Sequence, residues 1–407
     1  MEPVTGEQFV ALEESRGAHN YHPLPVVISE GEGAWVTDVA GRRYLDFLSA
    51  YSALNFGHRH PALVAAAHRQ LDQLTLTSRA VHNDQMGPFC AELADLIGQD
   101  RVLPMNSGAE AVETAIKLAR AWGYRVKGVP HDRATIVVAH NNFHGRTTTI
   151  ISFSGDPDAR NDFGPYTPGF VAVDHGDIDG LRQALQNPDI VAFLVEPVQG
   201  EAGIIIPPEG YLRAAADACA EAGVLFIADE IQSGLARTGT TLAVDHENVR
   251  PDLVLLGKAL GGGILPVSAV VGRGDVLEVL RPGEHGSTFG GNPLALAVGR
   301  AAIALLRTGE MQARSTELGT HMNARLTAEA PSSVKEVRGI GLWAGVEVHP
   351  QYAPVRPAAL QALDDGVIVK DTHATTLRLA PPIVVDKPDL DRGLDVILAA
   401  LHDQAQA

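Results

Sequence analysis

The sequence predicts an α/β fold in which a mostly parallel sheet is covered by helices, with a smaller α+β domain attached. Short apolar runs alternate with helical patterns through the middle of the chain, whereas short strands and helices mix in its last quarter. The chain has 407 residues, of which 45% are hydrophobic and 20% charged, a composition typical of a globular protein with about two domains.

The central sheet is predicted from continuous runs of Val, Ile, Leu and Phe, which are typical of strands buried on both faces. These runs are 135–139, 191–195, 224–228, 253–256 and 267–271. The stretch 211–222, which lies between two of them, has the apolar spacing of a helix. Since ligands of such sheets bind beyond the carboxyl ends of the strands, the residues that follow each run are the candidates for function.

The C-terminal part predicts a different architecture. Its expected helices are 293–306, 310–328, 358–363 and 390–401, and its expected strands are 334–337, 342–348 and 377–379. We expect an N-terminal segment, 1–54, to pack with this smaller domain. The remaining boundaries are then 55–292 for the large domain and 293–407 for the small one.

Charge and composition exclude several classes of protein. The formal net charge of −17 disfavours nucleic acid as a partner, because proteins that bind it present basic faces. The acidic N-terminus lacks the layout of a signal peptide, and no uninterrupted apolar run reaches membrane-spanning length. Only two cysteines occur, which excludes a disulfide framework and suits a reducing compartment. We therefore expect a cytoplasmic protein without a membrane partner.

A lysine follows one of the apolar runs directly. Lys258 lies between the run 253–256 and the glycines 261–263. A lysine at the end of a strand can simply extend its amine into solvent. A lysine in an apolar pocket instead has a lowered pKa and can form a Schiff base with an aldehyde. A phosphate-binding P-loop is excluded, because Ala259 stands where Ser or Thr is required.

A carboxylate ends another run. Asp229 follows five apolar residues, 224–228, and is therefore expected at the ligand edge of the sheet. The alternative is a solvated acidic turn. A fixed negative charge at the sheet edge can keep a pyridinium nitrogen protonated, which makes pyridoxal phosphate an electron sink.

Further segments suit an anionic aromatic cofactor. Ser107 and Glu110 form a capping box, so a helix is expected to begin there with free backbone N–H groups at Ser107, Gly108 and Ala109. Such a helix start binds phosphate, although most capping boxes are only caps.

Two loop motifs add an aromatic ring and hydroxyl groups. In FHGRT, Phe143 and His144 could stack on a ring with Arg146 beside them, and in HGSTFGGNP, Ser287 and Thr288 could donate to a phosphate. The histidine spacing matches no metal-ligand pattern, and no G-x-G-x-x-G follows a strand, so neither a metal nor a dinucleotide is expected.

The ordered set of motifs resembles the class III aminotransferases. These enzymes depend on pyridoxal phosphate and have fold type I of the pyridoxal-phosphate-dependent transferases. The motifs are SGAEAVETAIKLAR, FHGRT, EPVQGEAG, ADEIQSGLARTG, LLGKALGGG and HGSTFGGNP, and the resemblance covers residues 17–401. Within that family, GAHNYHPLPV, FLSAYSALNFGHRHP, LTLTSRA and the block 224–293 are similar to the ornithine aminotransferases.

The resemblance implies a role for each cofactor residue. Lys258 would bond to the cofactor aldehyde and shuttle a proton, and Asp229 would pair with the pyridine nitrogen. Gln232 would lie near the phenolic oxygen, and Phe143 would stack on the ring. Ser107, Gly108 and Ala109 would hold the phosphate, and Thr288 would reach it from a partner subunit. The implied assembly is a homodimer with shared active sites, and a higher assembly is left open.

The resemblance also implies how the substrates bind. Tyr21 and Arg146 would hold the α-amino and α-carboxylate groups of L-ornithine, and Tyr51 would shape its pocket. Glu201 would pair with Arg378 while the diamine is bound. Alternatively, the tyrosines are buried aromatics and the charged residues an ion-pair network.

The implied reaction transfers the δ-amine of L-ornithine to 2-oxoglutarate in a ping-pong cycle, which yields glutamate 5-semialdehyde and L-glutamate. Two residues depart from the ornithine pattern: His144 in FHGRT is more like acetylornithine aminotransferases, and His82 replaces a usual tyrosine. Acetylornithine or 4-aminobutyrate transamination therefore stays open. An epimerase or mutase of the same fold, and a non-catalytic binding protein, are the remaining alternatives.

Overall fold

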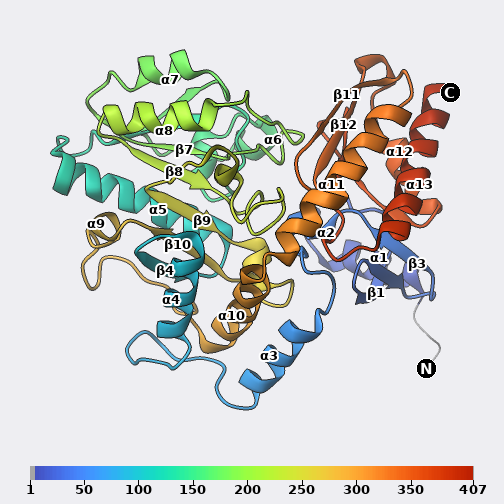
Figure 1. Cartoon of the computed structure of the whole chain (residues 1–407), viewed down its shortest axis with the longest axis horizontal. Helices are drawn as coiled ribbons and strands as arrows, with labels where there is room; N and C mark the ends of the chain where they lie inside the picture. The colour runs from blue at the N-terminus through green and yellow to red at the C-terminus, as the bar shows by residue number, and fades with distance from the viewer. Residues whose placement is uncertain (1–4, 407) are drawn as a thin grey trace.

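The structure, a computed structural model, describes residues 5–406 and consists of a larger and a smaller lobe (Figure 1). The larger lobe contains a seven-stranded sheet in the order β4-β10-β9-β8-β7-β5-β6. Its strands are β4 (Arg101–Met105), β5 (Thr135–Ala139), β6 (Phe170–Val173), β7 (Ile190–Val195), β8 (Leu225–Asp229), β9 (Leu253–Leu256) and β10 (Ser268–Gly272). Its helices are α3 (Pro61–Leu71), α4 (Met86–Ile97), α5 (Gly108–Trp122), α6 (Pro157–Arg160), α7 (Ile178–Ala184), α8 (Tyr211–Glu221), α9 (Gly274–Leu277) and α10 (Pro293–Arg307).

Strand β10 is the exception in an otherwise parallel sheet, because it pairs antiparallel with both β4 and β9. The pairs β9–β8, β8–β7, β7–β5 and β5–β6 are parallel. Strand β4 therefore runs in the same direction as β9, and the carboxyl ends of β4, β9, β8, β7 and β5 lie at one edge of the sheet.

Both faces of this sheet are covered, which explains why its strands are apolar without alternation. Every residue of β7, β8 and β9 is buried. Along β7, Phe193 and Val195 belong to the core that contains residues of α8 and α10. Ala192 and Leu194 belong to the core that contains residues of α5. The predicted α/β class with a mostly parallel, helix-covered sheet is confirmed.

All five predicted strands are present, with ends shifted by at most a residue. Strands β4 and β6 were not predicted. Strand β4 begins at the charged Arg101 and contains Pro104, which an edge strand tolerates. Strand β6 lies at the other edge, where Val171 and Ala172 are exposed and the apolar signal is weak.

The smaller lobe contains two four-stranded sheets, in the orders β11-β12-β15-β14 and β1-β2-β3-β13. Its strands are β1 (Ile28–Glu32), β2 (Trp35–Asp38), β3 (Arg43–Asp46), β11 (Val334–Gly339), β12 (Ala344–Val348), β13 (Val367–Ile368), β14 (Lys370–Thr372) and β15 (Thr376–Leu379). Its helices are α11 (Glu310–Glu329), α12 (Arg356–Asp364) and α13 (Lys387–Gln406). The predicted α+β character of this part is confirmed.

Strands from the N-terminal and C-terminal parts of the described chain pair in this lobe. Strand β13 pairs parallel with β3, with Val367 opposite Leu45, and Phe47 belongs to the same core as Leu394 of α13. The predicted boundary at residue 54 stays a prediction. A boundary at residue 292 would assign α10 to the smaller domain, although the apolar face of α10 packs into the core of the larger lobe.

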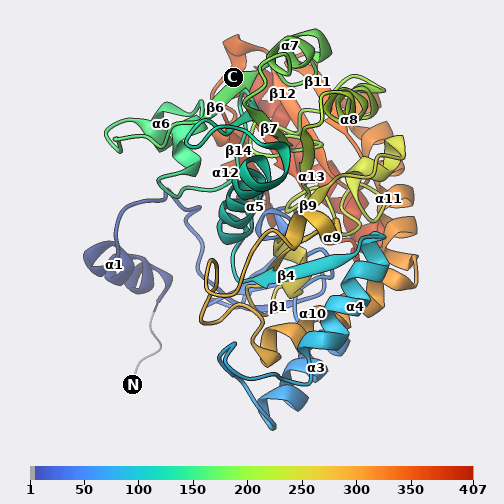
Figure 2. The same cartoon turned by 90° about the vertical axis from the view of Figure 1, so that its left-hand side faces the viewer.

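Two N-terminal elements stand out. Helix α1 (Gly6–Arg16), at the start of the described chain, buries none of its residues and lies away from the body in Figure 2. The short turn α2 (Ser49–Ser52) has positive φ angles at all four residues, from 45° to 70°. Left-handed backbone costs roughly 1–2 kcal/mol per non-glycine residue, so the surrounding packing must hold this turn in place.

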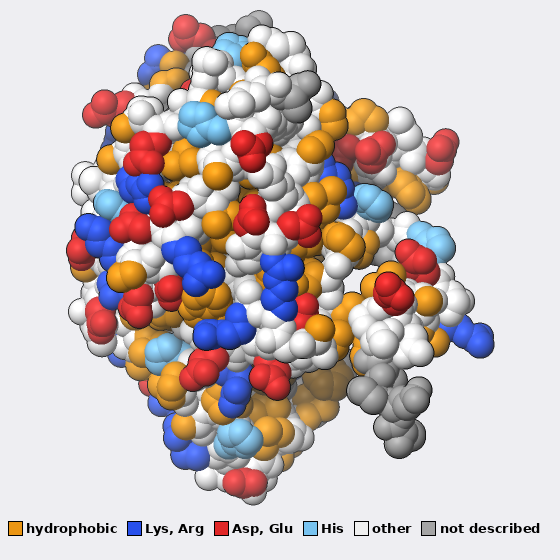
Figure 3. Space-filling model, turned by 90° about the vertical axis from the view of Figure 1, so that its right-hand side faces the viewer, with side chains coloured by type: hydrophobic (Ala, Val, Ile, Leu, Met, Phe, Trp, Pro, Cys, Tyr) orange, Lys and Arg blue, Asp and Glu red, His pale blue; other side chains and the backbone are white. Residues whose placement is uncertain are grey.

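The surface of the smaller lobe is mixed in charge: Figure 3 shows acidic and basic side chains interspersed over that face. Over residues 5–406, no helix is both long and apolar enough to cross a membrane.

Candidate active site

Neighbouring strands place chemically different groups at one edge of the central sheet. Lys258 follows β9 and Asp229 ends β8, whereas the loop with Phe143 and His144 follows β5. Together with Gln232 and the start of α5, they line a cavity of about 200 Å³. The parallel arrangement of β9, β8 and β5 thus gathers residues that are more than a hundred positions apart in the chain.

Lys258 contributes the amine that lines this cavity. It begins a 3₁₀ turn, Lys258–Gly261, with a positive φ of 42°, a conformation that non-glycine residues rarely adopt. Burial lowers the pKa of Lys258 to about 8; Glu201 opposes this shift and the positive charge of Arg378 adds to it. A lysine with such a pKa is partly neutral near pH 8, as attack on an aldehyde requires.

Asp229 is a buried residue in the lining of the same cavity, and both of its carboxylate oxygens are held. The Nδ1–H group of His144 donates to Oδ2 at 2.6 Å, and the backbone N–H of Ile231 donates to Oδ1 at 3.1 Å. A carboxylate accepts up to about four hydrogen bonds, so acceptor capacity is left for a ligand.

The start of α5 provides a site for an anion. Ser107 is its N-cap, with the capping box that the sequence predicted. One detail of the prediction is wrong: the N–H of Ser107 is not free, because it donates to Glu110 Oε2 at 2.7 Å. Gly108 and Ala109 line the cavity, and as residues of the first helical turn their N–H groups have no partner within the helix. A Cβ at Gly108 would come within 3.1 Å of Ile231, which favours glycine there.

An ion pair lies on the side of the smaller lobe. Arg378 of β15 donates from Nη1 to Glu201 Oε2 at 2.7 Å, and its guanidinium lies 5.3 Å from the centre of the Tyr51 ring. Burial raises the pKa of Glu201, but the charges of Arg378 and Lys258 more than offset this and lower it below its usual value. Tyr51 is held there by the left-handed turn α2.

Three of the predicted residues that do not line this cavity, Tyr21, Arg146 and Thr288, are exposed in the single chain. Tyr21 is 75% exposed and lines a neighbouring cavity of about 520 Å³ together with Tyr51. Arg146 is exposed, with its guanidinium 5.7 Å from the centre of the Phe143 ring. Thr288 is exposed on the loop before α10, next to Ser287, whose hydroxyl accepts a hydrogen bond from Asn106 at 2.8 Å.

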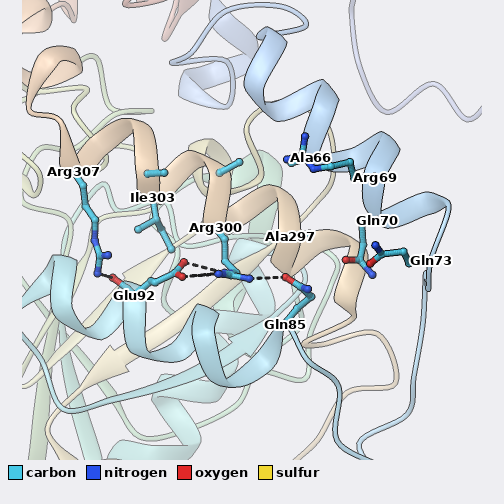
Figure 4. Close-up of a pocket in the computed structure, with 12 residues that line it drawn as sticks. Ala66, Arg69, Gln70, Gln73, Gln85, Glu92, Ala297, Arg300, Ile303 and Arg307 are labelled. Carbon is cyan, nitrogen blue, oxygen red and sulfur yellow. Dashed lines mark hydrogen bonds and ion pairs between the residues drawn. The ribbon is translucent and has the colours of Figure 1, made fainter.

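Another cavity, of about 460 Å³, lies between α3, α4 and α10 (Figure 4). Arg300 is fixed at its base by Glu92 at 2.7 Å and by Gln85 at 2.8 Å. Because these contacts occupy the guanidinium, and no lysine lines the cavity, it does not offer the chemistry of the Lys258 site.

The contacts of two buried residues of the site were missed by the sequence reasoning. His144 was expected to stack on a ring or to mark a departure from the ornithine pattern, and its contact with Asp229 was not foreseen. Glu196, the residue after β7, was not singled out. Glu196 accepts the backbone N–H of Phe143 at 2.9 Å, and burial raises its pKa to about 7. A signal was available for Glu196, since it follows a buried apolar strand just as Asp229 does.

The cavity fits pyridoxal phosphate. It presents an amine with a lowered pKa, a buried carboxylate, an aromatic ring and a helix start suited to a phosphate, and together these match the four parts of that molecule. The fold and the site thus define an enzyme of the pyridoxal-phosphate-dependent transferase type.

Comparison with known proteins shows the family. The family model described as aminotransferase class-III matches residues 16–401, and the chain belongs to this family. It is 52% identical over 388 residues to the ornithine aminotransferase of Geobacillus sp. (strain WCH70), covering 95% of this chain and 96% of the relative.

Solved structures agree with this result. The ornithine aminotransferase of Toxoplasma gondii superposes with a TM-score of 0.98 at 44% identity, covering 100% of this chain and 96% of that one. That crystal structure has pyridoxal phosphate at partial occupancy in its active site. The acetylornithine aminotransferase of Elizabethkingia anophelis superposes with a TM-score of 0.90 at 47% identity, covering 98% and 99% of the two chains. The predicted family and enzyme class are confirmed.

Proposed function

We propose that this aminotransferase moves the δ-amine of L-ornithine to 2-oxoglutarate, with pyridoxal phosphate as its cofactor. The products are L-glutamate and glutamate 5-semialdehyde, which cyclises to pyrroline-5-carboxylate. Full-length relatives with the name ornithine aminotransferase support the reaction. The single observation that carries the substrate assignment is the Glu201–Arg378 pair at 2.7 Å beside Lys258.

When bound, the cofactor supplies an aldehyde that captures amines and a ring that withdraws electrons from the adjacent carbon. Lys258 would hold the cofactor through its aldehyde, and its amine would be placed to move a proton at the substrate carbon. Asp229 would pair with the ring nitrogen, Gln232 would lie near the phenolic oxygen, and Phe143 would cover the ring. The N–H groups of Gly108 and Ala109 would hold the phosphate, together with the Ser107 hydroxyl.

The ion pair allows one pocket to accept two unlike amine donors. L-Glutamate reacts through its α-amine and needs its α-carboxylate near Lys258, which is the position of Arg378. L-Ornithine reacts through its δ-amine, and a free Arg378 would bind its carboxylate in the wrong orientation. Glu201 pairs with Arg378 in that half-reaction and so keeps it from the carboxylate of ornithine. Tyr21 and Arg146 hold the α-amino and α-carboxylate groups of ornithine, and Tyr51 shapes its pocket.

A homodimer would complete this site. The exposure of Thr288 and of the neighbouring Phe289, at 55%, supports a role for this loop in a partner's phosphate site. Leu74 and Val81 are also exposed apolar residues, as expected of a surface covered by a second copy. We propose a cytoplasmic location, in agreement with the reducing compartment inferred from the cysteines.

The test is a panel of amine donors: ornithine, acetylornithine, 4-aminobutyrate and lysine. Ornithine with 2-oxoglutarate should yield pyrroline-5-carboxylate, detected by its coloured adduct with 2-aminobenzaldehyde. Accumulation of the α-keto acid of ornithine would show that Tyr21 and Arg146 do not fix the α-end. Acetylornithine is the second candidate donor, favoured by His144 in FHGRT and by the Elizabethkingia structure, and faster turnover of it than of ornithine would replace the proposal.

A further inference from the structure

The His144 ring is buried between the loop after β5 and the end of β8. Its Nδ1 atom is 2.6 Å from Asp229 Oδ2, and because a carboxylate only accepts, Nδ1 carries the hydrogen. Over residues 5–406, the other ring nitrogen, Nε2, is buried without a hydrogen-bond partner. The ring is therefore linked to the protein's polar groups through Asp229 alone.

A buried nitrogen without a partner costs free energy that an apolar ring of similar size would avoid. A phenylalanine would fill this space, beside Phe153 whose ring centre is 6.0 Å away, without that cost. The histidine is thus unfavourable as packing, and its contact with Asp229 is the feature that a phenylalanine could not reproduce.

The loop that carries His144 is itself held in place. The Asn142 side chain donates to the carbonyl oxygen of Ala139 at 2.6 Å, and the Phe143 N–H donates to Glu196 Oε2 at 2.9 Å. Glu196 also accepts from the N–H of Gly200 at 3.4 Å. The loop is thus fixed at the two residues before His144, so the ring meets Asp229 in one defined geometry.

We infer that His144 is a positioning residue for the cofactor nitrogen. It acts through Asp229 by holding Oδ2, while Ile231 holds Oδ1, so that the free acceptor positions of the carboxylate face the cavity. Glu196 supports this arrangement by anchoring the loop at Phe143. The inference rests on the cofactor assignment but not on the choice of ornithine as the amine donor.

The experiment compares two substitutions that differ in the donor. His144→Asn retains an N–H group near the position of Nδ1, and His144→Leu removes it at similar volume. Dissociation constants for pyridoxal phosphate are measured on the cofactor-free proteins, and the ¹⁵N resonance of the ring nitrogen is recorded with labelled cofactor. His246→Leu is the control, because His246 makes a comparable hydrogen bond, 2.9 Å to the Thr238 carbonyl oxygen, away from the cavity.

Hydrogen bonds to charged groups correspond to about 10- to 150-fold in an equilibrium constant. His144→Leu should weaken cofactor binding by about that factor and shift the nitrogen resonance toward the unprotonated form. His144→Asn should remain within about threefold of the wild type, and His246→Leu should change neither property.

Unchanged affinity and resonance in a folded His144→Leu protein would overturn the inference. If that variant does not fold, His144→Asn decides alone: a folded protein with a loss of tenfold or more would show that the ring acts by packing. A failure of ornithine as donor leaves both readouts unaffected, so the two proposals fail separately.

Discussion

Replacing Lys258 with methionine should stabilise the protein when the cofactor is absent. Burial lowers the pKa of this lysine from 10.5 to about 8 in the folded protein, so protonation costs more there than in the unfolded chain. At about 1.36 kcal/mol per pKa unit, the cost is about 3 kcal/mol at pH 7. Methionine has a similar length, carries no charge and avoids this cost.

The difference in stability between the wild type and the variant should decrease as the pH rises. Below pH 8 both the folded and the unfolded protein carry the charged lysine, and the full cost is present. Between pH 8 and 10.5 the folded protein releases the proton while the unfolded chain retains it. The stability of the wild type therefore rises relative to the variant, and the difference falls to about 1 kcal/mol at pH 10.

The assay is thermal unfolding of both cofactor-free proteins at one protein concentration, at pH 7 and pH 10. A domain of this size shifts by about 2–4 °C per kcal/mol, so the variant should melt roughly 6–12 °C higher at pH 7. Lys387→Met, at an exposed lysine, is the control and should change little at either pH. A difference that is absent at pH 7, or equal at both pH values, would refute the reasoning.

Three further outcomes are expected. Glu201→Ala should speed the glutamate half-reaction relative to the ornithine half-reaction by about 10- to 150-fold, measured by stopped-flow with each donor separately, and an unchanged ratio would make the pair purely structural. Mixing the Thr288→Ala and Lys258→Ala proteins should restore activity in hybrid dimers, because one of the two active sites then contains neither substitution. Absence of recovered activity would show that Thr288 serves the site of its own subunit. Ala50→Gly should raise the free energy of unfolding by about 0.5–1 kcal/mol in denaturant titrations, because Ala50 has a φ of 45°, and a decrease would show that the turn is not strained.

The central sheet was predictable because its strands are buried on both faces and therefore appear as uninterrupted apolar runs. The same pattern drew attention to Lys258 and Asp229, which follow such runs. The direction of β10 was not predictable, since a buried strand has the same composition whether it runs parallel or antiparallel. Strand β4 escaped notice because Arg101 and Pro104 interrupt its apolar pattern.

The contact between His144 and Asp229 could not be predicted from the residues, because it joins side chains 85 positions apart. It depends on the neighbours of each strand in the sheet, which the apolar pattern does not specify. The roles of Tyr21, Arg146 and Thr288 stay predictions for a similar reason. All three are exposed in the single chain, so its structure gives them no contacts that would test these roles.

The pairing of β13 with β3 has a consequence for synthesis of the protein. Leu45 is made about 320 residues before its partner Val367. At about 5–20 residues per second, the first three strands leave the ribosome roughly 15–65 s before the strand that completes their sheet exists. During that interval β3 has a free edge, and the apolar side chains of Leu45 and Phe47 lack the residues of α13 that bury them. The larger lobe can be complete by then. The segment of the nascent chain most exposed to aggregation is therefore the N-terminal one, which contains β1 to β3.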